Sequence, residues 1–306
     1  MINSLEISNK KFKLDFLGIG ASKSGTTWIF ECLKEHPEIC GSMNEEAGLF
    51  NSLKEGNRGS KPYSELYNLN FSHCKKEQLI GEYTPMYLAD FEIIHLIKKH
   101  YPEIKLIICL RNPIERAYSQ YLSYKLGGYI SSKKTFEDVV KEGAENLFVK
   151  LGLYYSQVKL VFELFPRENI LVLINEDIAK NPTEFIQKVY KFLGVDSNFV
   201  PSVVNKRIHQ LPENPLKSPI LNRTTILTLR VFRKKPLRYI ALFLKKIGVD
   251  RLVNSINSKN LRKEEKRKPY KKPPIPKEVR ERLFKIYQPD IFNLEKLINR
   301  NLSFWR

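Results

Sequence analysis

The stretch FLGIGASKSGTTWIFECL, residues 16–33, decides how this chain folds. The apolar run at residues 14–19 predicts a buried strand, and apolar residues after Thr26 recur at helical spacing. Small residues surround a single cation, Lys23, in the turn between them. A strand, a tight turn and a helix start direct backbone N–H groups and the helix dipole toward one point, which favours an anion. We therefore predict a phosphate site formed by Lys23, Ser24, Gly25, Thr26 and Thr27.

This turn differs from the common P-loop, in which a glycine stands immediately before the lysine. Here Ser22 precedes Lys23, and the second glycine, Gly25, follows it. The alternative interpretation, a plain strand-to-helix turn with a surface lysine, explains fewer of the features that coincide here. The anion site is the preferred interpretation.

The rest of the first 200 residues alternates between strand and helix patterns. Continuous apolar runs at 105–110 and 170–174 are typical of central parallel strands, and shorter strands are expected at 39–40 and 79–80. Helices are predicted at 91–100, 114–126, 135–142, 152–165, 182–193 and about 277–300, whereas 41–50 read as a polar loop and 51–70 as an irregular connection. This alternation predicts an α/β fold with a P-loop-like, doubly wound parallel sheet flanked by helices.

Four polar residues follow four of these strands: Lys23, Glu46, Glu82 and Arg111. Ligands of doubly wound folds bind at the carboxyl ends of the strands. We therefore expect these four side chains to lie at one edge of the sheet and to carry the chemistry.

Two motifs resemble those of sulfotransferases that use 3′-phosphoadenosine 5′-phosphosulfate (PAPS). KSGTTW, residues 23–28, resembles their 5′-phosphosulfate loop, and LRNPIERAYSQY, residues 110–121, resembles their second signature. The resemblance implies that Arg111 and Ser119 bind the 3′-phosphate, a role that suits the planar guanidinium fork. It also implies PAPS as the donor, 3′-phosphoadenosine 5′-phosphate (PAP) as the product, and no metal.

The carbohydrate, heparan-type branch of that family fits better than the cytosolic aryl-type branch. GEYTPMYL at 81–88 and the segments 152–178 and 272–305 resemble the heparan type, and the C-terminal motif of the aryl type is missing. The resemblance implies transfer to a hydroxyl or amine of a carbohydrate or glycolipid.

The resemblance also assigns roles at the reacting centre. Glu46 matches the general base, and Lys23 would steady the leaving phosphate. Glu45 and Glu82 remain alternative bases. Lys268 is the best match for a basic loop over the nucleotide, with Lys266 and Arg267 as neighbouring alternatives.

Three positions depart from the family pattern. Glu45 stands where Lys or Asn is usual, Gly48 stands where His often occurs, and Tyr83 replaces a Lys. These departures affect what the resemblance implies about acceptor binding more than what it implies about donor binding. The sequence therefore leaves open the acceptor, the sulfated atom and the choice between O- and N-sulfation.

The net charge of +19 lies entirely in the last third of the chain. Residues 201–306 contain 27 basic and 8 acidic residues, whereas residues 1–200 contain 25 of each. We expect a sulfotransferase core at 1–200, a basic helical insertion at 201–265, and a C-terminal loop and helix at 266–306 that complete the same domain. The basic, apolar stretch 224–247 suggests contact with an anionic membrane, although packing of its apolar face on the domain is favoured.

The remaining composition narrows the class of protein. The chain shows no secretory signal and no apolar run of membrane-spanning length, so we expect a cytoplasmic protein, with the inner membrane face as a further option. We expect the four cysteines to be reduced structural thiols and expect no zinc site. A P-loop kinase and a basic nucleic-acid-binding protein are the competing functions. The first lacks the Walker glycine and the second leaves KSGTT unexplained, so no nucleic-acid partner is expected.

Overall fold

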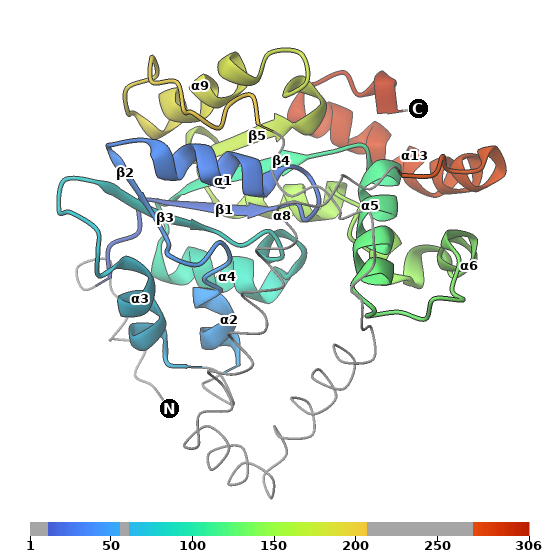
Figure 1. Ribbon diagram of the computed structural model, residues 1–306, viewed down its shortest axis with the longest axis horizontal. Helices are drawn as coiled ribbons and strands as arrows, with labels where there is room; N and C mark the ends of the chain where they lie inside the picture. Colours follow the sequence, from blue (N-terminus) through green and yellow to red (C-terminus); the bar gives the residue numbers. More distant parts are fainter. Residues whose placement is uncertain (1–11, 56–60, 207–271, 306) are drawn as a thin grey trace, which may run out of the picture. The chain divides into compact units, whose positions relative to one another are not determined.

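The computed structural model describes residues 12–55, 61–206 and 272–305 (Figure 1). The described strands form one sheet in the order β2-β3-β1-β4-β5. They are β1 (Phe16–Gly20), β2 (Ile39–Gly41), β3 (Leu79–Tyr83), β4 (Lys105–Leu110) and β5 (Ile170–Ile174). All neighbouring strands are parallel, with Phe16 opposite both Gly81 and Lys105. The predicted parallel α/β sheet is confirmed.

Helices cover both faces of the sheet (Figure 1). Helices α1 (Thr26–Glu35) and α9 (Pro182–Leu193) lie on one face, and α4 (Phe91–His100) and α8 (Tyr155–Leu164) lie on the other. The other described α-helices are α2 (Leu49–Lys54), α3 (Tyr63–Phe71), α5 (Pro113–Leu126), α6 (Phe136–Lys141), α7 (Leu147–Lys150) and α13 (Lys277–Ile298). Single 3-10 turns lie at Tyr87–Ala89, Gly143–Glu145, Arg167–Asn169, Asn175–Asp177 and Ser303–Trp305.

Helix α9 shows how local sequence fixes these boundaries. The Asn181 side chain accepts a hydrogen bond from the Glu184 N–H, Pro182 occupies the first turn, and Gly194 ends the helix in a left-handed conformation. Its apolar face packs with α1 on the sheet in a cluster that includes Trp28, Phe30, Ile107 and Phe185. This packing holds the start of α1, and with it the Lys23 turn, against the sheet.

The chain divides into two compact units. The first comprises residues 1–120, 139–209 and 277–306 and contains the whole sheet. The second comprises 121–138 and 210–276, of which the structure describes 121–138 and 272–276. There the Tyr121 ring packs on Phe136 with the ring centroids 5.3 Å apart. The predicted boundaries at 200 and 265 stay predictions, because most of that insertion lies outside the described residues.

The irregular connection predicted for residues 51–70 is wrong, because this region contains most of α2 and α3. Few of its residues are apolar, so the helical period is weak. The helices are held by tertiary contacts instead. The Tyr63 ring lies edge-on to Phe12 and Phe50, and the Tyr63 and Tyr101 hydroxyls are 2.8 Å apart. Packing of this kind overrides local propensity.

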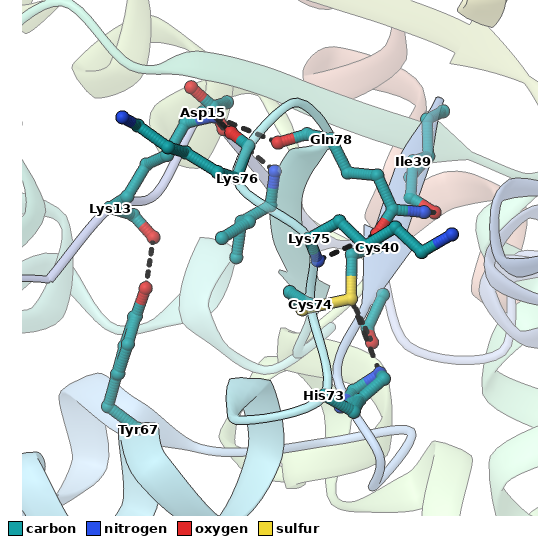
Figure 2. Close-up of a disulfide and its surroundings, with 12 residues drawn as sticks. Lys13, Asp15, Ile39, Cys40, Tyr67, His73, Cys74, Lys75, Lys76 and Gln78 are labelled. Atoms are coloured by element: carbon teal, nitrogen blue, oxygen red, sulfur yellow. Dashed lines mark hydrogen bonds and ion pairs between the residues drawn. A yellow bond between two sulfur atoms is a disulfide. The ribbon is translucent and has the colours of Figure 1, made fainter. Parts of the chain in front are cut away.

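The expectation of four reduced cysteines is wrong for two of them. Cys40 and Cys74 form a disulfide (Figure 2), whereas Cys32 and Cys109 are free and buried. The two paired residues are 34 positions apart, and they meet because Cys40 lies in β2 while Cys74 lies in the connection that leads into the neighbouring strand β3. Sequence spacing carries no sign of such a pairing.

Candidate active site

The sheet brings the predicted chemical residues to one edge. Lys23 follows the carboxyl end of β1, Glu45 and Glu46 follow that of β2, and Arg111 follows that of β4. Glu82 lies within β3, next to its end, and not after the strand as predicted. The four strands are parallel neighbours, so their carboxyl ends share the edge at which ligands of this fold class bind.

The turn after β1 has the backbone shape of an anion-binding nest. Lys23 has a φ of 67° and Gly25 a φ of 83°, so left-handed residues alternate along the turn. Gly25 is also the N-cap of α1, and it offers no side chain to the first N–H groups of that helix. These groups and the positive end of the helix dipole therefore face the turn.

Residues that follow β4 and β5, on one side of β1, hold this turn. Arg111, which follows β4, donates from Nη1 to the Lys23 carbonyl at 3.2 Å. Asn175, which follows β5, donates from Nδ2 to the Ser24 carbonyl at 3.0 Å. The buried Cys109 thiol lies 3.1 Å from the same carbonyl oxygen. Sequence reasoning missed Asn175, because an isolated Asn after a strand carries no motif.

Residues of the second signature make contacts with the turn. Ser119 in α5 is buried, with 9% of its surface exposed. The next residue, Gln120, accepts a hydrogen bond from the Ser22 hydroxyl through Oε1 at 3.3 Å. The Arg111–Ser119 stretch is thus connected to the Lys23 turn at both ends.

Two carboxylates act on the Lys23 ammonium. Desolvation by burial lowers the pKa of Lys23, the Glu46 and Glu45 carboxylates oppose that change, and the Arg116 guanidinium adds to it. Desolvation by the surrounding protein raises the pKa of Glu46, Glu45 raises it further, and Lys23 lowers it. Glu45 also accepts a hydrogen bond from the Thr27 hydroxyl in the first turn of α1. The turn and the loop after β2 therefore form one electrostatic unit.

The contacts of Glu82 differ from those of the other two candidate bases. Its side chain is fully buried and accepts from the Gly48 N–H at 3.0 Å, the Thr84 hydroxyl at 3.0 Å and the Tyr87 hydroxyl at 2.8 Å. Burial raises the pKa of Glu82, and these donors oppose the rise. Such a carboxylate holds the end of the loop at residues 42–48, whereas Glu46 is exposed.

Arg116 is a second residue that sequence reasoning missed. Its guanidinium is fully buried, donates to the Phe148 carbonyl, and lowers the pKa of Lys23. A buried Arg four residues after Asn112 in α5 resembles an ordinary surface cation in the sequence. Its contribution is visible only once the fold places it behind the turn.

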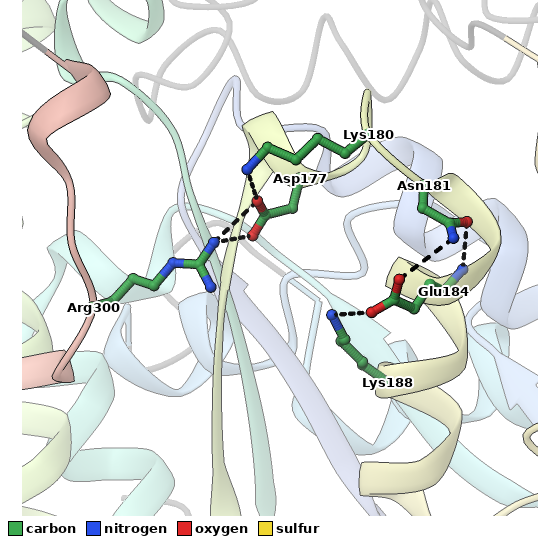
Figure 3. Close-up of polar contacts among 6 residues, drawn as sticks. All are labelled: Asp177, Lys180, Asn181, Glu184, Lys188 and Arg300. Carbon is green, nitrogen blue, oxygen red and sulfur yellow. Dashed lines mark hydrogen bonds and ion pairs between the residues drawn. The ribbon is translucent and has the colours of Figure 1, made fainter.

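The C-terminal segment also contacts the chain just after the carboxyl end of β5, where Arg300 meets Asp177 (Figure 3). Arg300 donates from Nη2 to both carboxylate oxygens of Asp177 at 3.0 and 2.8 Å, and Lys180 lies 2.8 Å from the same carboxylate. A pocket of about 380 Å³ runs beneath this pair, along β5 and α9. Among the described residues, its lining includes none of the predicted site residues.

Two predictions fall on residues that the structure does not describe. Lys268 and its alternatives Lys266 and Arg267 lie outside the described residues, as does the stretch 224–247. These assignments stay predictions. Within the described ranges no helix is long and apolar enough to cross a membrane.

A possible metal-ligand cluster occurs away from this site. Cys40, His73 and Cys74 place one ligand atom each within 4.8 Å of one another. Two of those atoms are the sulfurs of the disulfide, and a metal needs the thiolates instead.

A parallel sheet with an anion nest after its first strand defines a phosphate- or nucleotide-binding α/β protein. The family model described as "Sulfotransferase domain" matches residues 13–290. The chain therefore belongs to the sulfotransferase domain family.

Known proteins of that kind are similar to parts of the chain. Membrane-associated sulfotransferase kil1 of Dictyostelium discoideum is 34% identical over 107 residues, which cover 35% of this chain and 22% of the relative. Human heparan sulfate glucosamine 3-O-sulfotransferase 6 is 27% identical over 184 residues, 58% of this chain and 51% of the relative. The chain thus spans about half, or less, of the length of these relatives.

A solved structure shares the fold over nearly the whole length. The sulfotransferase from Alicyclobacillus acidocaldarius superposes with a TM-score of 0.66 and 22% identity, covering 96% of this chain and 99% of that one. At this identity the similarity concerns the fold alone.

Proposed function

We propose that the protein transfers a sulfuryl group from PAPS to a hydroxyl or amine of a carbohydrate or glycolipid. The observation that carries this proposal is the Lys23 turn: an anion nest whose lysine is favoured in its charged form by the carboxylates of Glu45 and Glu46. A cation for a leaving phosphate and a base for an acceptor proton then lie within reach of one centre. The family of the chain supports the same reaction.

The residues present fit the two phosphate groups of PAPS. The uncapped N-terminus of α1 and the nest suit the 5′-phosphosulfate, which Lys23 would contact. Arg111 donates to the Lys23 carbonyl, and Ser119 directly precedes Gln120, whose side chain accepts a hydrogen bond from Ser22. These two residues would hold the 3′-phosphate.

PAPS supplies the activated sulfuryl group when it is bound. We assign to Glu46 the removal of the acceptor proton, because its side chain is accessible and its raised pKa brings it nearer to neutral pH, where a general base is most effective. Lys23 would neutralise charge that develops on the phosphate oxygen. Glu45 is the alternative base. Glu82 is less suited, because its carboxylate already accepts the three hydrogen bonds that hold the loop.

The acceptor class rests on the named relatives, one of which acts on heparan sulfate glucosamine. A saccharide is therefore the acceptor we propose, and the departures at Glu45, Gly48 and Tyr83 argue that its details differ. Contact of the stretch 224–247 with an anionic membrane stays a prediction, as does a cytoplasmic location.

Binding and transfer can be tested separately. PAP and ATP are titrated against the protein by calorimetry, followed by an acceptor screen with sulfur-labelled PAPS. We expect PAP to bind, ATP to bind at least tenfold more weakly, and label to reach a saccharide. Equal binding of ATP with transfer of its terminal phosphate would instead show a kinase. Binding of duplex DNA in preference to PAP would show a nucleic-acid-binding protein.

A further inference from the structure

The loop that carries Glu45 and Glu46 is held by one asparagine on another element. Asn70 in α3 accepts hydrogen bonds through its side-chain Oδ1 from the Asn44 N–H at 3.0 Å and from Asn44 Nδ2 at 2.9 Å. Its backbone carbonyl accepts from the Met43 N–H at 3.1 Å. Three hydrogen bonds therefore join Asn70 to the two residues that precede Glu45.

The side-chain amide of Asn70 is fixed with its oxygen toward Asn44. The side chain is buried, with 1% of its surface exposed, and its Nδ2 donates to the Leu66 carbonyl at 2.9 Å. Because the donor end is used within its own helix, the acceptor end points at the loop. Displacing a buried amide whose donor and acceptor are both hydrogen-bonded costs free energy, because these groups would be left without partners.

The Cys40–Cys74 disulfide connects the segment that follows Asn70 to the sheet. Cys74 lies four residues after Asn70, and Cys40 lies two residues before Ser42, where the loop begins. The bond therefore joins the end of α3 to the strand from which the loop leaves. The Cys40–Cys74 bond thus fixes the chain just before residues 41–44, and Asn70 fixes it at Met43 and Asn44. We call Asn70 and this disulfide the clamp.

We propose that Asn70 is a positioning residue for the candidate base, and that the Cys40–Cys74 disulfide makes its hold on the loop dependent on the thiol redox state. The clamp touches neither Lys23 nor Arg111 in any contact described above. Its loss should therefore slow transfer more than it weakens donor binding, which the loop reaches through the hydrogen bond between Glu45 and Thr27. The proposal rests on the proposed function, because it assumes that the loop carries the base.

The disulfide is placed where a dithiol reductant can open it. The Cys74 sulfur is on a partly exposed residue, whereas Cys40 is buried, with 5% of its surface exposed. A thiolate of the dithiol attacks Cys74 Sγ, and Cys40 leaves with the electron pair of the S–S bond. The departing Cys40 thiolate takes its proton from the solvent. The second thiol of the reductant then releases Cys74, so the dithiol is oxidised as the protein disulfide gains two electrons.

Other contacts should keep the reduced protein folded. Gln78 donates from Nε2 to the Pro37 carbonyl at 2.9 Å, which bridges the two segments that the disulfide joins. The Tyr67 hydroxyl donates to the Lys13 carbonyl at 2.8 Å and holds α3 independently (Figure 2). We therefore expect loosening of the loop, not unfolding.

The first test compares oxidised and dithiol-reduced protein, with a chelator present because the freed sulfurs and His73 could take up a metal. Hydrogen exchange of the peptide that covers residues 42–48 should become at least about fivefold faster on reduction, while exchange in α1 stays unchanged. The turnover number should fall about 10- to 100-fold, the scale of a base displaced by about 1 Å. PAP affinity should change by a smaller factor than the turnover number. The Cys40→Ser/Cys74→Ser double variant should behave like reduced protein and should not respond to the dithiol.

The second test concerns Asn70 itself. Asn70→Leu should lower the turnover number with little change in PAP affinity, and Asn70→Asp, which keeps an acceptor for Asn44, should recover part of the loss. The matched control is Asn68→Leu, the same change at an exposed position of α3.

Unchanged exchange on reduction, or a turnover number for Asn70→Leu equal to that of Asn68→Leu, overturns the clamp. If no acceptor is ever sulfated, the proposed function fails, whereas the exchange measurement still decides whether the clamp exists.

Discussion

Replacing Gly25 by alanine tests whether the Lys23 turn depends on its backbone shape. Gly25 has a φ of 83°, and a Cβ atom added there would lie 2.5 Å from Asn175 Nδ2 and 3.3 Å from Ile178 Cδ1. The left-handed conformation costs an alanine about 1–2 kcal/mol. Displacing Asn175 also removes its hydrogen bond to the Ser24 carbonyl, worth about 0.5–1.5 kcal/mol.

These terms sum to a loss of about 1.5–3.5 kcal/mol in the free energy of unfolding. The alanine also lowers the entropy of the unfolded chain, which raises the free energy of unfolding by about 0.4–1 kcal/mol. Gly143→Ala is the matched control, because Gly143 has a φ of 62° and nothing lies within 4 Å of an added Cβ. The control shares the backbone cost and the entropy term, so the difference between the variants isolates the contact with Asn175.

Urea unfolding of both variants measures this difference, and calorimetry with PAP measures the consequence for binding. We expect Gly25→Ala to be less stable than Gly143→Ala by about 0.5–1.5 kcal/mol, the value of the Asn175 hydrogen bond. It should also bind PAP at least tenfold more weakly, since one charge-assisted hydrogen bond is worth about 1.5–3 kcal/mol. In the Gly25→Ala/Asn175→Ala double variant, the two losses should not add. Equal stability of the two single variants, together with unchanged PAP binding, would refute the argument.

Three further predictions concern Arg111, Glu46 and Asp290. Arg111→Ala should weaken PAP by about 2–3 kcal/mol but leave adenosine 5′-phosphosulfate, which lacks the 3′-phosphate, almost unaffected in calorimetry; equal losses for both ligands would remove Arg111 from the 3′-phosphate. Glu46→Gln should lower the turnover number about 10²–10⁴-fold with PAP affinity nearly intact; the same pattern in Glu45→Gln alone would move the base to Glu45. Burial raises the pKa of Asp290 from 3.8 to about 6, although its carboxylate accepts the Tyr154 and Tyr155 N–H groups. The folded state thus binds this proton more tightly, and the free energy of unfolding should fall by about 1–3 kcal/mol as the pH rises from about 4 to about 6, with some discount for partial exposure. Urea unfolding of Asp290→Asn should lack this part of the pH dependence, and identical slopes would contradict the assignment.

Strong local signals explain why much of the fold could be predicted. The strand at Lys105–Leu110 and the helix at Pro182–Leu193 have the predicted boundaries, because a continuous apolar run marks the first and a Pro and a Gly mark the ends of the second. The Lys23 turn was predictable for the same reason, since residues 14–33 contain strand, turn and helix start in sequence order. Each of these features is encoded within about twenty neighbouring residues.

The missed features all depend on residues distant in the sequence. Helix α3 is stabilised by aromatic contacts with Phe12 and Phe50, and the disulfide joins positions 34 apart. Asn175 follows β5, and only β4 separates β5 from β1 in the sheet. This strand order brings Asn175 to the Ser24 carbonyl. An isolated Asn or Cys carries no local pattern, so its role becomes visible only through the sheet order.

The three carboxylates that the sequence left as alternatives differ in their surroundings more than in their sequence context. Glu82 is buried among three hydrogen-bond donors, Glu45 accepts from the hydroxyl of Thr27, and Glu46 is exposed while facing Lys23. A general base must reach an incoming acceptor, so accessibility favours Glu46, whereas a fully hydrogen-bonded carboxylate is better suited to fixing a loop. Glu82 holds the end of the loop, and Asn70 holds its start. Glu46 lies between these two anchors and has an accessible carboxylate, so the anchors determine its position. The assignment of the base and the proposed clamp are therefore linked, and variants of Glu46 and Asn70 should share one signature: slower turnover with PAP binding retained.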